Sequence, residues 1–165
     1  LRLPPVIVVD EPTVGLDPRE RIRFRSLLGR LAQERIVLFS THVVEDVAAA
    51  CDRVLVIAEG HLVFDGEPAA LARAAQGYVW EISVPTDETL MLPDGVIHVE
   101  ENLSALGTLV RHKVLAESLP DPRATPLDPL LEDGYMWLVA SARKREEIRR
   151  SDQENVALLD PAFAR

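Results

Sequence analysis

The sequence predicts an α/β fold, in which part of a mainly parallel sheet is flanked by helices and followed by a smaller, β-rich α+β segment. Two short apolar runs, Val6–Val9 and Ile36–Phe39, are typical of strands covered on both faces. The segment between them, residues 18–33, has the apolar spacing of a helix, with Asp17 as its expected N-cap. A strand, helix and strand of this length predict a parallel pair.

Further elements follow along the chain. Val43, Val47 and Cys51 share one helical face, and two apolar runs then flank Glu59-Gly60, a pair typical of a hairpin. Pro68 begins another short helix. From Gly77 onward, three alternating segments predict half-exposed strands, at residues 78–84, 95–101 and 108–117. A helix of about a dozen residues is expected after the prolines at 120–129, on weak periodicity.

These changes of pattern predict three parts. Residues 1–76 form the α/β part, residues 77–140 form the accessory α+β part, and residues 141–165 form a polar segment that is either a solvated helix or a tail.

Composition and charge argue against several functions. The net charge of -9 and the pI of about 4.9 disfavour binding to a nucleic-acid backbone, so no nucleic-acid partner is expected. The single cysteine, Cys51, cannot form an internal disulfide, which favours a reducing compartment. The longest apolar runs are far shorter than the ~18 residues of a membrane span, so no direct span is expected.

Two adjacent carboxylates end the first predicted strand. Burying Asp10 and Glu11 beside an apolar strand is costly unless a cation or a proton-transfer role compensates them. Asp10 is suited to hold Mg²⁺, directly or through water, and Glu11 is suited to orient or deprotonate an attacking water. The alternative is a surface pair that caps a strand-to-helix turn.

Three motifs in order carry a family resemblance. "VIVVDEPTVGLDP", "VLFSTH" and "VLVIAEGHLVFDG" together resemble the second half of an ABC-type ATPase nucleotide-binding domain, over residues 4 to about 67. The resemblance implies a partial P-loop NTPase sheet, with ATP and Mg²⁺ as cofactors. It also implies that Asp10 is the Mg²⁺ ligand, Glu11 the catalytic carboxylate, Asp17 the D-loop aspartate, and His42 the switch histidine at the γ-phosphate.

The sequence of residues 41–71 resembles that of the ATPase subunits of bacterial multidrug- or polyether-type exporters, and residues 78–140 resemble their accessory C-terminal segment. This resemblance implies a cytoplasmic subunit on the inner face of the membrane. It would pair with a second ATPase subunit, identical or not, and dock on a membrane permease, coupling ATP hydrolysis to transport.

The motifs that bind the phosphates in such a site are missing from the sequence. No GxxxxGK[ST] occurs, neither Lys113 nor Lys144 follows a glycine, and no LSGGQ-like stretch is present. We therefore expect a fragment of a longer ATPase that alone does not hydrolyse ATP, with exposed apolar edges and marginal stability. Two alternatives are a soluble ABC-family ATPase acting on nucleic acid or ribosomes, and a non-catalytic half-domain that binds a partner.

Several other residues have ordinary structural interpretations. The arginines of the first helix are expected on a solvated face, Trp80 and Trp137 in aromatic core contacts, and Cys51 as a small buried hydrophobe. No metal is assigned to the remaining histidines, which lack ligand spacing: His61, His98 and His112.

Overall fold

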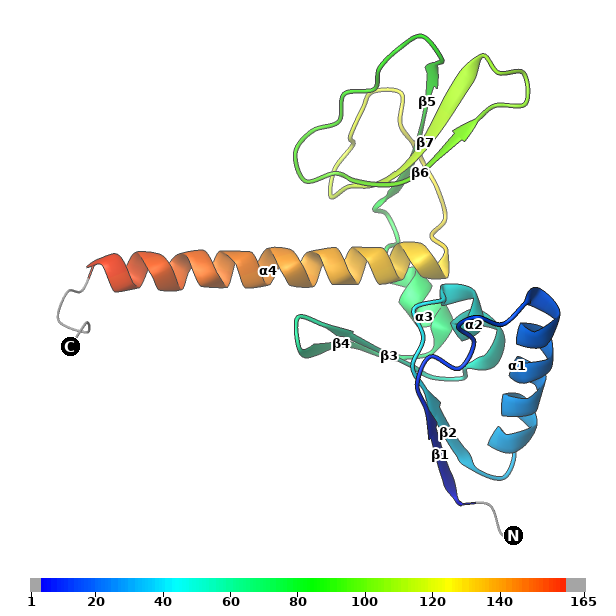
Figure 1. The fold of residues 1–165 in the computed structure, drawn as a ribbon. Helices are drawn as coiled ribbons and strands as arrows, with labels where there is room; N and C mark the ends of the chain where they lie inside the picture. The colour runs from blue at the N-terminus through cyan, green and yellow to red at the C-terminus, as the bar shows by residue number, and fades with distance from the viewer. Residues whose placement is uncertain (1–3, 160–165) are drawn as a thin grey trace. The chain divides into compact units, whose positions relative to one another are not determined.

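The computed structural model describes residues 4–159, with side chains as far as Gln153, and Figure 1 shows its elements. The chain divides into two compact units between Val54 and Leu55. Residues 160–165 of the expected polar segment lie outside the described residues. The part boundaries expected after residues 76 and 140 remain predictions.

The first unit contains the predicted strand–helix–strand arrangement. Its elements are β1 (Val6–Val9), α1 (Pro18–Ala32), β2 (Ile36–Phe39) and α2 (Val44–Ala50). The two strands pair in parallel, with Val9 opposite Phe39, which confirms the expected crossover (Figure 1). Asp17 caps α1, as expected, because its carboxylate accepts a hydrogen bond from the Glu20 backbone N–H at 2.8 Å.

The expectation that both faces of these strands are covered was wrong for one face. Alternate residues of both strands are exposed: Val6 47 %, Val8 68 %, Ile36 67 % and Leu38 52 %. The alternating residues on the other face are partly covered, and α1 contacts β2. A two-stranded sheet with one helix offers cover for only one face, so an apolar face stays open, as expected for an incomplete sheet.

The hairpin and the short helix that follow are confirmed. Strands β3 (Val54–Ala58) and β4 (His61–Gly66) pair across the two-residue loop Glu59-Gly60. Both loop residues have positive φ, 49° and 76°, which is the geometry of a type I′ turn. Helix α3 (Pro68–Arg73) begins at the predicted proline.

The second unit holds a four-stranded antiparallel sheet in the order β6–β7–β5–β8. Its strands are β5 (Val79–Pro85), β6 (Ile97–Leu103), β7 (Leu109–Leu115) and β8 (Thr125–Pro126), and the first three confirm the predicted alternating segments. Apolar clusters cover both faces. One centres on Ala75, Val79 and Leu115 with Met136 and Trp137 against it, and the other on Ile82, Val84 and Val114.

The last helix is longer than predicted. Helix α4 runs over Leu131–Leu159, 29 residues, so the polar segment continues the helix instead of following it. The sequence has no Gly or Pro between residues 135 and 160, and Glu146 forms ion pairs with Arg149 and Arg150 one turn later. The helix alternative is therefore confirmed as far as residue 159, and most side chains over residues 143–153 are exposed. Over residues 4–159, none of the helices has the length and apolar character needed to span a membrane.

A buried ion pair joins the start of α4 to the sheet. Asp133 is fully buried, and its carboxylate lies 2.7 Å from the Lys113 ammonium on β7. The same carboxylate accepts a hydrogen bond from the Leu130 backbone N–H at 2.7 Å. A buried carboxylate without such partners would be strongly unfavourable, so this contact fixes where α4 begins.

The two tryptophans occupy structural positions, as expected. The Trp137 ring stacks on Tyr78 with centroids 4.3 Å apart, and the Trp80 indole N–H donates to the Ala116 carbonyl at 3.3 Å. Both side chains are therefore engaged by the second unit itself.

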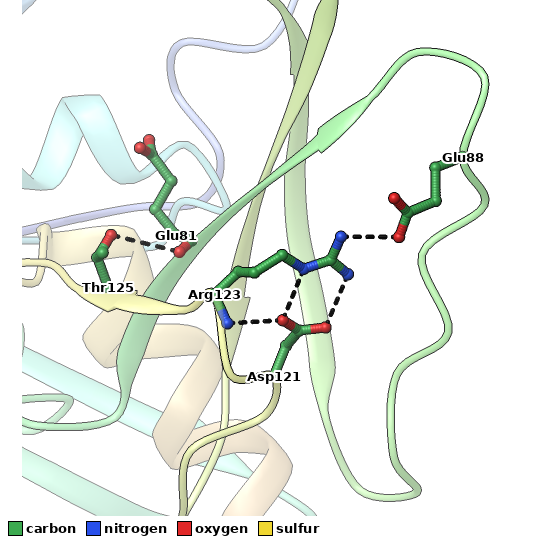
Figure 2. Close-up of polar contacts among 5 residues, drawn as sticks. All are labelled: Glu81, Glu88, Asp121, Arg123 and Thr125. Atoms are coloured by element: carbon green, nitrogen blue, oxygen red, sulfur yellow. Dashed lines mark hydrogen bonds and ion pairs between the residues drawn. The ribbon is translucent and has the colours of Figure 1, made fainter.

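An exposed arginine links two loops of the second unit (Figure 2). Arg123 binds the Asp121 carboxylate with two nitrogens, at 2.9 Å each, and its third nitrogen lies 2.7 Å from Glu88. Beside it, the Thr125 hydroxyl donates to the Glu81 carbonyl at 3.4 Å. Arg123 side-chain and backbone hydrogen bonds lower the pKa of Asp121 from 3.8 to about 2.

We predict that Gly134→Ala destabilises the fold. A Cβ at residue 134 would lie 1.9 Å from the Leu71 carbonyl oxygen, so α3 and α4 would have to separate, at a cost of at least ~1–3 kcal/mol. Gly29→Ala is the matched control, because a Cβ there meets nothing within 4 Å, and it should stabilise α1 by ~0.5–1 kcal/mol. Urea unfolding measures both changes. Equal midpoints for the two variants would contradict the close helix contact.

We predict that Arg123→Gln raises the pKa of Asp121 towards 3.8, as measured by NMR titration of the carboxyl group. Because the folded-state pKa is the lower one, the contribution of this ion pair to stability is present above pH 3.8 and is lost as the pH falls towards 2. Lys144→Gln removes an exposed ion pair with Glu117 and serves as the control. An unchanged Asp121 titration in Arg123→Gln would refute the assignment.

Candidate functional site

The candidate site lies where the two parallel strands end. Asp10 and Glu11 follow β1, and Ser40 and His42 follow β2. Because the strands are parallel and Val9 lies opposite Phe39, their carboxyl ends share one edge. The Ser40 backbone N–H donates to the Val9 carbonyl at 3.1 Å, which continues the pairing one residue beyond the strands.

Ser40 ties the two carboxylate residues together. Its hydroxyl donates a short hydrogen bond to the Asp10 carboxylate and accepts one from the Glu11 backbone N–H at 2.9 Å. Ser40 was not predicted as a site residue, although it directly follows the second predicted strand. A hydroxyl at that position is the signal that was available.

Glu11 and His42 form a pair that faces solvent. The His42 Nδ1 atom lies 2.9 Å from a Glu11 carboxylate oxygen, and the side chains are 71 % and 37 % exposed respectively. The structure therefore brings together the three side chains predicted to act on a nucleotide phosphate, through Ser40 for Asp10 and directly for Glu11 and His42. Their catalytic and binding roles remain predictions.

Glu11 has an unusual backbone conformation. Its φ of 45° lies in the left-handed region, which a residue with a Cβ adopts at a cost of roughly 1–2 kcal/mol. This conformation turns the chain sharply after the strand, so that Glu11 and Asp10 do not continue the alternation of β1. Strain of this kind is concentrated at functional sites, which favours a role for Glu11 beyond capping.

Asp17 has a different position. Besides accepting from the Glu20 N–H, it donates its own backbone N–H to the Glu20 carboxylate at 3.1 Å, which completes a capping box. Within the described part of the chain, no hydrogen bond joins Asp17 to Asp10, Glu11 or His42. Its expected role in contact with a second ATPase subunit remains a prediction.

A buried network supports the turn that carries Glu11. Asp46 of α2 is fully buried and accepts hydrogen bonds from the Thr13 hydroxyl at 2.5 Å and from Arg25 Nε at 2.8 Å. Arg25 is thus a partner of a buried carboxylate, which corrects the expectation that the arginines of α1 all lie on a solvated face. The available signal was Asp46 itself, a carboxylate within a segment of mostly apolar residues predicted to be helical.

Cys51 directly follows α2, within electrostatic reach of Asp46. Its side chain is partly buried, and burial raises the pKa of the thiol, with the charges of Asp52 and Asp46 adding to the effect. This fits the expected role of a small packing residue better than that of a reactive nucleophile.

The residues present fit a hydrated Mg²⁺ ion at Asp10. Mg²⁺ prefers oxygen ligands and keeps several waters, so one exposed carboxylate with a neighbouring hydroxyl is a suitable donor set. The sequence does not contain the phosphate-binding loop of a nucleotide site, because no GxxxxGK[ST] motif occurs in it. The arrangement can therefore hold a cation and orient water, but it lacks the backbone cradle for a nucleotide.

A second group of polar side chains comes together on the sheet of the second unit. His98 Nε2 lies 3.0 Å from His112 Nδ1, and Glu101 lies beside them, 3.9 Å from the same His112 atom. These two histidines lack ligand spacing in the sequence, but the structure places them in contact. Residues 98 and 112 are on different strands, so their spacing along the chain gave no sign of the contact.

Comparisons with known proteins point to one family. The chain is 42 % identical over 89 residues to the Nod factor export ATP-binding protein I of Burkholderia lata, a match covering 53 % of this chain and 29 % of that protein. It is 34 % identical over 84 residues to the uncharacterized ABC transporter ATP-binding protein YxlF of Bacillus subtilis, covering 51 % and 28 %.

A longer match includes most of this chain. It is 30 % identical over 159 residues to the probable multidrug ABC transporter ATP-binding protein YbhF of Escherichia coli, covering 87 % of this chain and 27 % of that protein. The chain thus spans between a quarter and a third of the length of these relatives. No protein-family model matches it.

We predict that Glu11→Gly is more stable than Glu11→Ala by ~1 kcal/mol, because glycine adopts positive φ without steric cost. The control is Arg23, an exposed position inside α1, where the order should reverse and glycine should be less stable than alanine by ~1 kcal/mol. Denaturant unfolding of the four variants gives both differences. If alanine and glycine are equivalent at residue 11, the left-handed turn is not held in solution.

Proposed function

We propose, from its match to part of ABC transporter ATP-binding proteins, that the chain supplies the hydrolytic side of an ATP site in a transporter subunit. The observation that carries the proposal is the meeting of Asp10, Glu11 and His42 at the shared carboxyl edge of β1 and β2. Ligands of open α/β sheets bind at such an edge.

Each of the three side chains has a proposed role. Asp10 holds Mg²⁺, directly or through a water, and Ser40 keeps its carboxylate in place. When bound, Mg²⁺ neutralises charge on the phosphates. Glu11 orients the attacking water and accepts its proton, and it is exposed enough for a water to reach it. His42 contacts both Glu11 and the transferred phosphoryl group.

The missing phosphate cradle is supplied by further protein in this proposal. The open apolar face of β1 and β2, with Val6, Val8, Ile36 and Leu38 exposed, supports packing of a further layer of a P-loop NTPase domain against it. The relatives are three to four times as long as the matched segment, which is consistent with this arrangement.

The proposed role of this chain in transport rests on the names of its relatives. Nod factor export and multidrug transport are attributes of those proteins. For this chain we propose an export-type subunit that pairs with a second ATPase subunit and docks on a membrane permease, at the cytoplasmic face. The acidic net charge of -9 favours this role over action on nucleic acid.

We predict that this chain's motif sustains ATP hydrolysis when placed in a complete ATP-binding protein. In the experiment, the matched segment of the Burkholderia lata protein is replaced by the aligned segment of this chain, and ATP turnover is compared with that of the unaltered protein. Glu11→Gln in the chimera should lower kcat by roughly a hundredfold or more, because the water loses its base.

The matched control is Glu45→Gln, which removes an exposed carboxylate from α2 three residues after His42 and should leave turnover unchanged. Equal activity of the Glu11→Gln and Glu45→Gln chimeras would refute the role of Glu11. The chain by itself should not hydrolyse ATP, and turnover by it that Glu11→Gln abolishes would show that no further cradle is needed.

A further inference from the structure

Two histidines and a glutamate form a compact group on the sheet of the second unit. His98 and Glu101 lie on β6, and His112 lies on the neighbouring strand β7. Each offers one ligand atom, and the three atoms lie within 4.8 Å of one another. The two imidazole nitrogens are 3.0 Å apart, and a Glu101 oxygen is 3.9 Å from His112 Nδ1.

A β-bulge places these side chains on one face. Residues 98 and 101 are three apart, so in a regular strand they would point to opposite faces. The register with β7 shifts between His98 and Glu100: His98 pairs with Val114, whereas Glu101 pairs with His112. The extra residue therefore returns Glu101 to the face that carries His98 and His112. Bulges commonly re-aim a side chain at a functional site.

The group combines one buried ligand residue with two that are accessible to solvent. His112 is 9 % exposed and pairs across the sheet with the fully buried Ile82, so the central strand holds its ring. His98 and Glu101 are exposed on β6, which ends the sheet order. A cation and its water ligands can thus reach the group from solvent, while rigid strands position the donors.

We infer that His98, Glu101 and His112 form a binding site for Zn²⁺. Two imidazole nitrogens and one carboxylate oxygen are a donor set that suits Zn²⁺, and three protein ligands leave a fourth position for water or another ligand. Mg²⁺ is a poor occupant, because it prefers an all-oxygen shell. The site is separate in its residues and in its ligand chemistry from the proposed Mg²⁺ position at Asp10, and it does not depend on the proposed ATPase function.

Zinc titration of the full chain, after treatment with a chelator, tests the inference. Isothermal calorimetry with ZnCl₂ in excess MgCl₂ should show one site per chain, and Co²⁺ used as a probe should give visible d–d absorption. His98→Gln and Glu101→Gln should each weaken Zn²⁺ binding at least about tenfold, because loss of an outer-shell partner alone costs that much. Both residues are exposed, so these variants should fold even if His112→Gln does not.

Matched controls separate this site from general zinc binding. Glu100→Gln removes the neighbouring carboxylate, which pairs with Lys113 and so belongs to the other face. His61→Gln removes an exposed histidine of β4, and His42→Gln removes the histidine of the candidate ATP site. All three should keep wild-type affinity. Zn²⁺ should also raise the Tm of the wild type and of these controls, but not of His98→Gln or Glu101→Gln.

Two results would overturn the inference. Absence of saturable Zn²⁺ binding would show that the two histidines form only a structural hydrogen bond. Binding that His98→Gln and Glu101→Gln leave unchanged, or that His42→Gln removes, would place the ion elsewhere on the chain.

Discussion

The first unit depends on the hydrogen bonds and the ion pair of one buried carboxylate, that of Asp46. It holds Thr13, two residues after Glu11, and Arg25 in the middle of α1, so one side chain joins the strand-end turn to both helices. Removing one partner of a buried charge typically costs ~3–5 kcal/mol, whereas an exposed pair such as Glu11 and His42 contributes ~0–1 kcal/mol. The buried network therefore anchors the turn that follows Glu11, whereas the exposed contact with His42 adds little to stability.

Local pattern was sufficient to predict most elements of the fold. Asp17-Pro18 marked the start of α1, Glu59-Gly60 marked the hairpin, and β-branched runs marked β1 and β2, because each depends on residues adjacent in sequence. The length of α4 was left open, between a solvated helix and a tail after Ala140, because apolar periodicity is weak there and charged pairs support the helix instead. At the candidate site, Asp10, Glu11 and His42 were identified from their motifs, but Ser40 and Asp46 act through contacts about 30 residues apart in sequence. Such contacts depend on strand register and helix packing, which local patterns do not specify.

The two units differ in how completely their sheets are covered. In the second unit, apolar clusters occupy both faces of the four-stranded sheet, and the Lys113–Asp133 pair fixes α4 at its start. In the first, β1 and β2 leave alternate valines, an isoleucine and a leucine exposed. A two-stranded sheet seldom supports itself, so the geometry at its carboxyl edge is best maintained when another layer covers that face. A layer over that face would therefore link stability to function in the first unit, because the strands that it stabilises are those whose carboxyl ends carry Asp10, Glu11 and His42.

The two polar groups of the chain are built by different means. Asp10, Glu11 and Ser40 are oxygen donors brought together by the parallel register of β1 and β2 and by a left-handed turn at Glu11. His98, Glu101 and His112 are brought to one face by an extra residue in β6, and nitrogen donors predominate. Hard cations such as Mg²⁺ discriminate in favour of the first donor set and borderline cations such as Zn²⁺ in favour of the second. Asp10 and Glu11 were predicted from their motif, whereas Ser40 and the group of His98, Glu101 and His112 could not be recognised from residue spacing, because strand register and the bulge in β6 create their contacts.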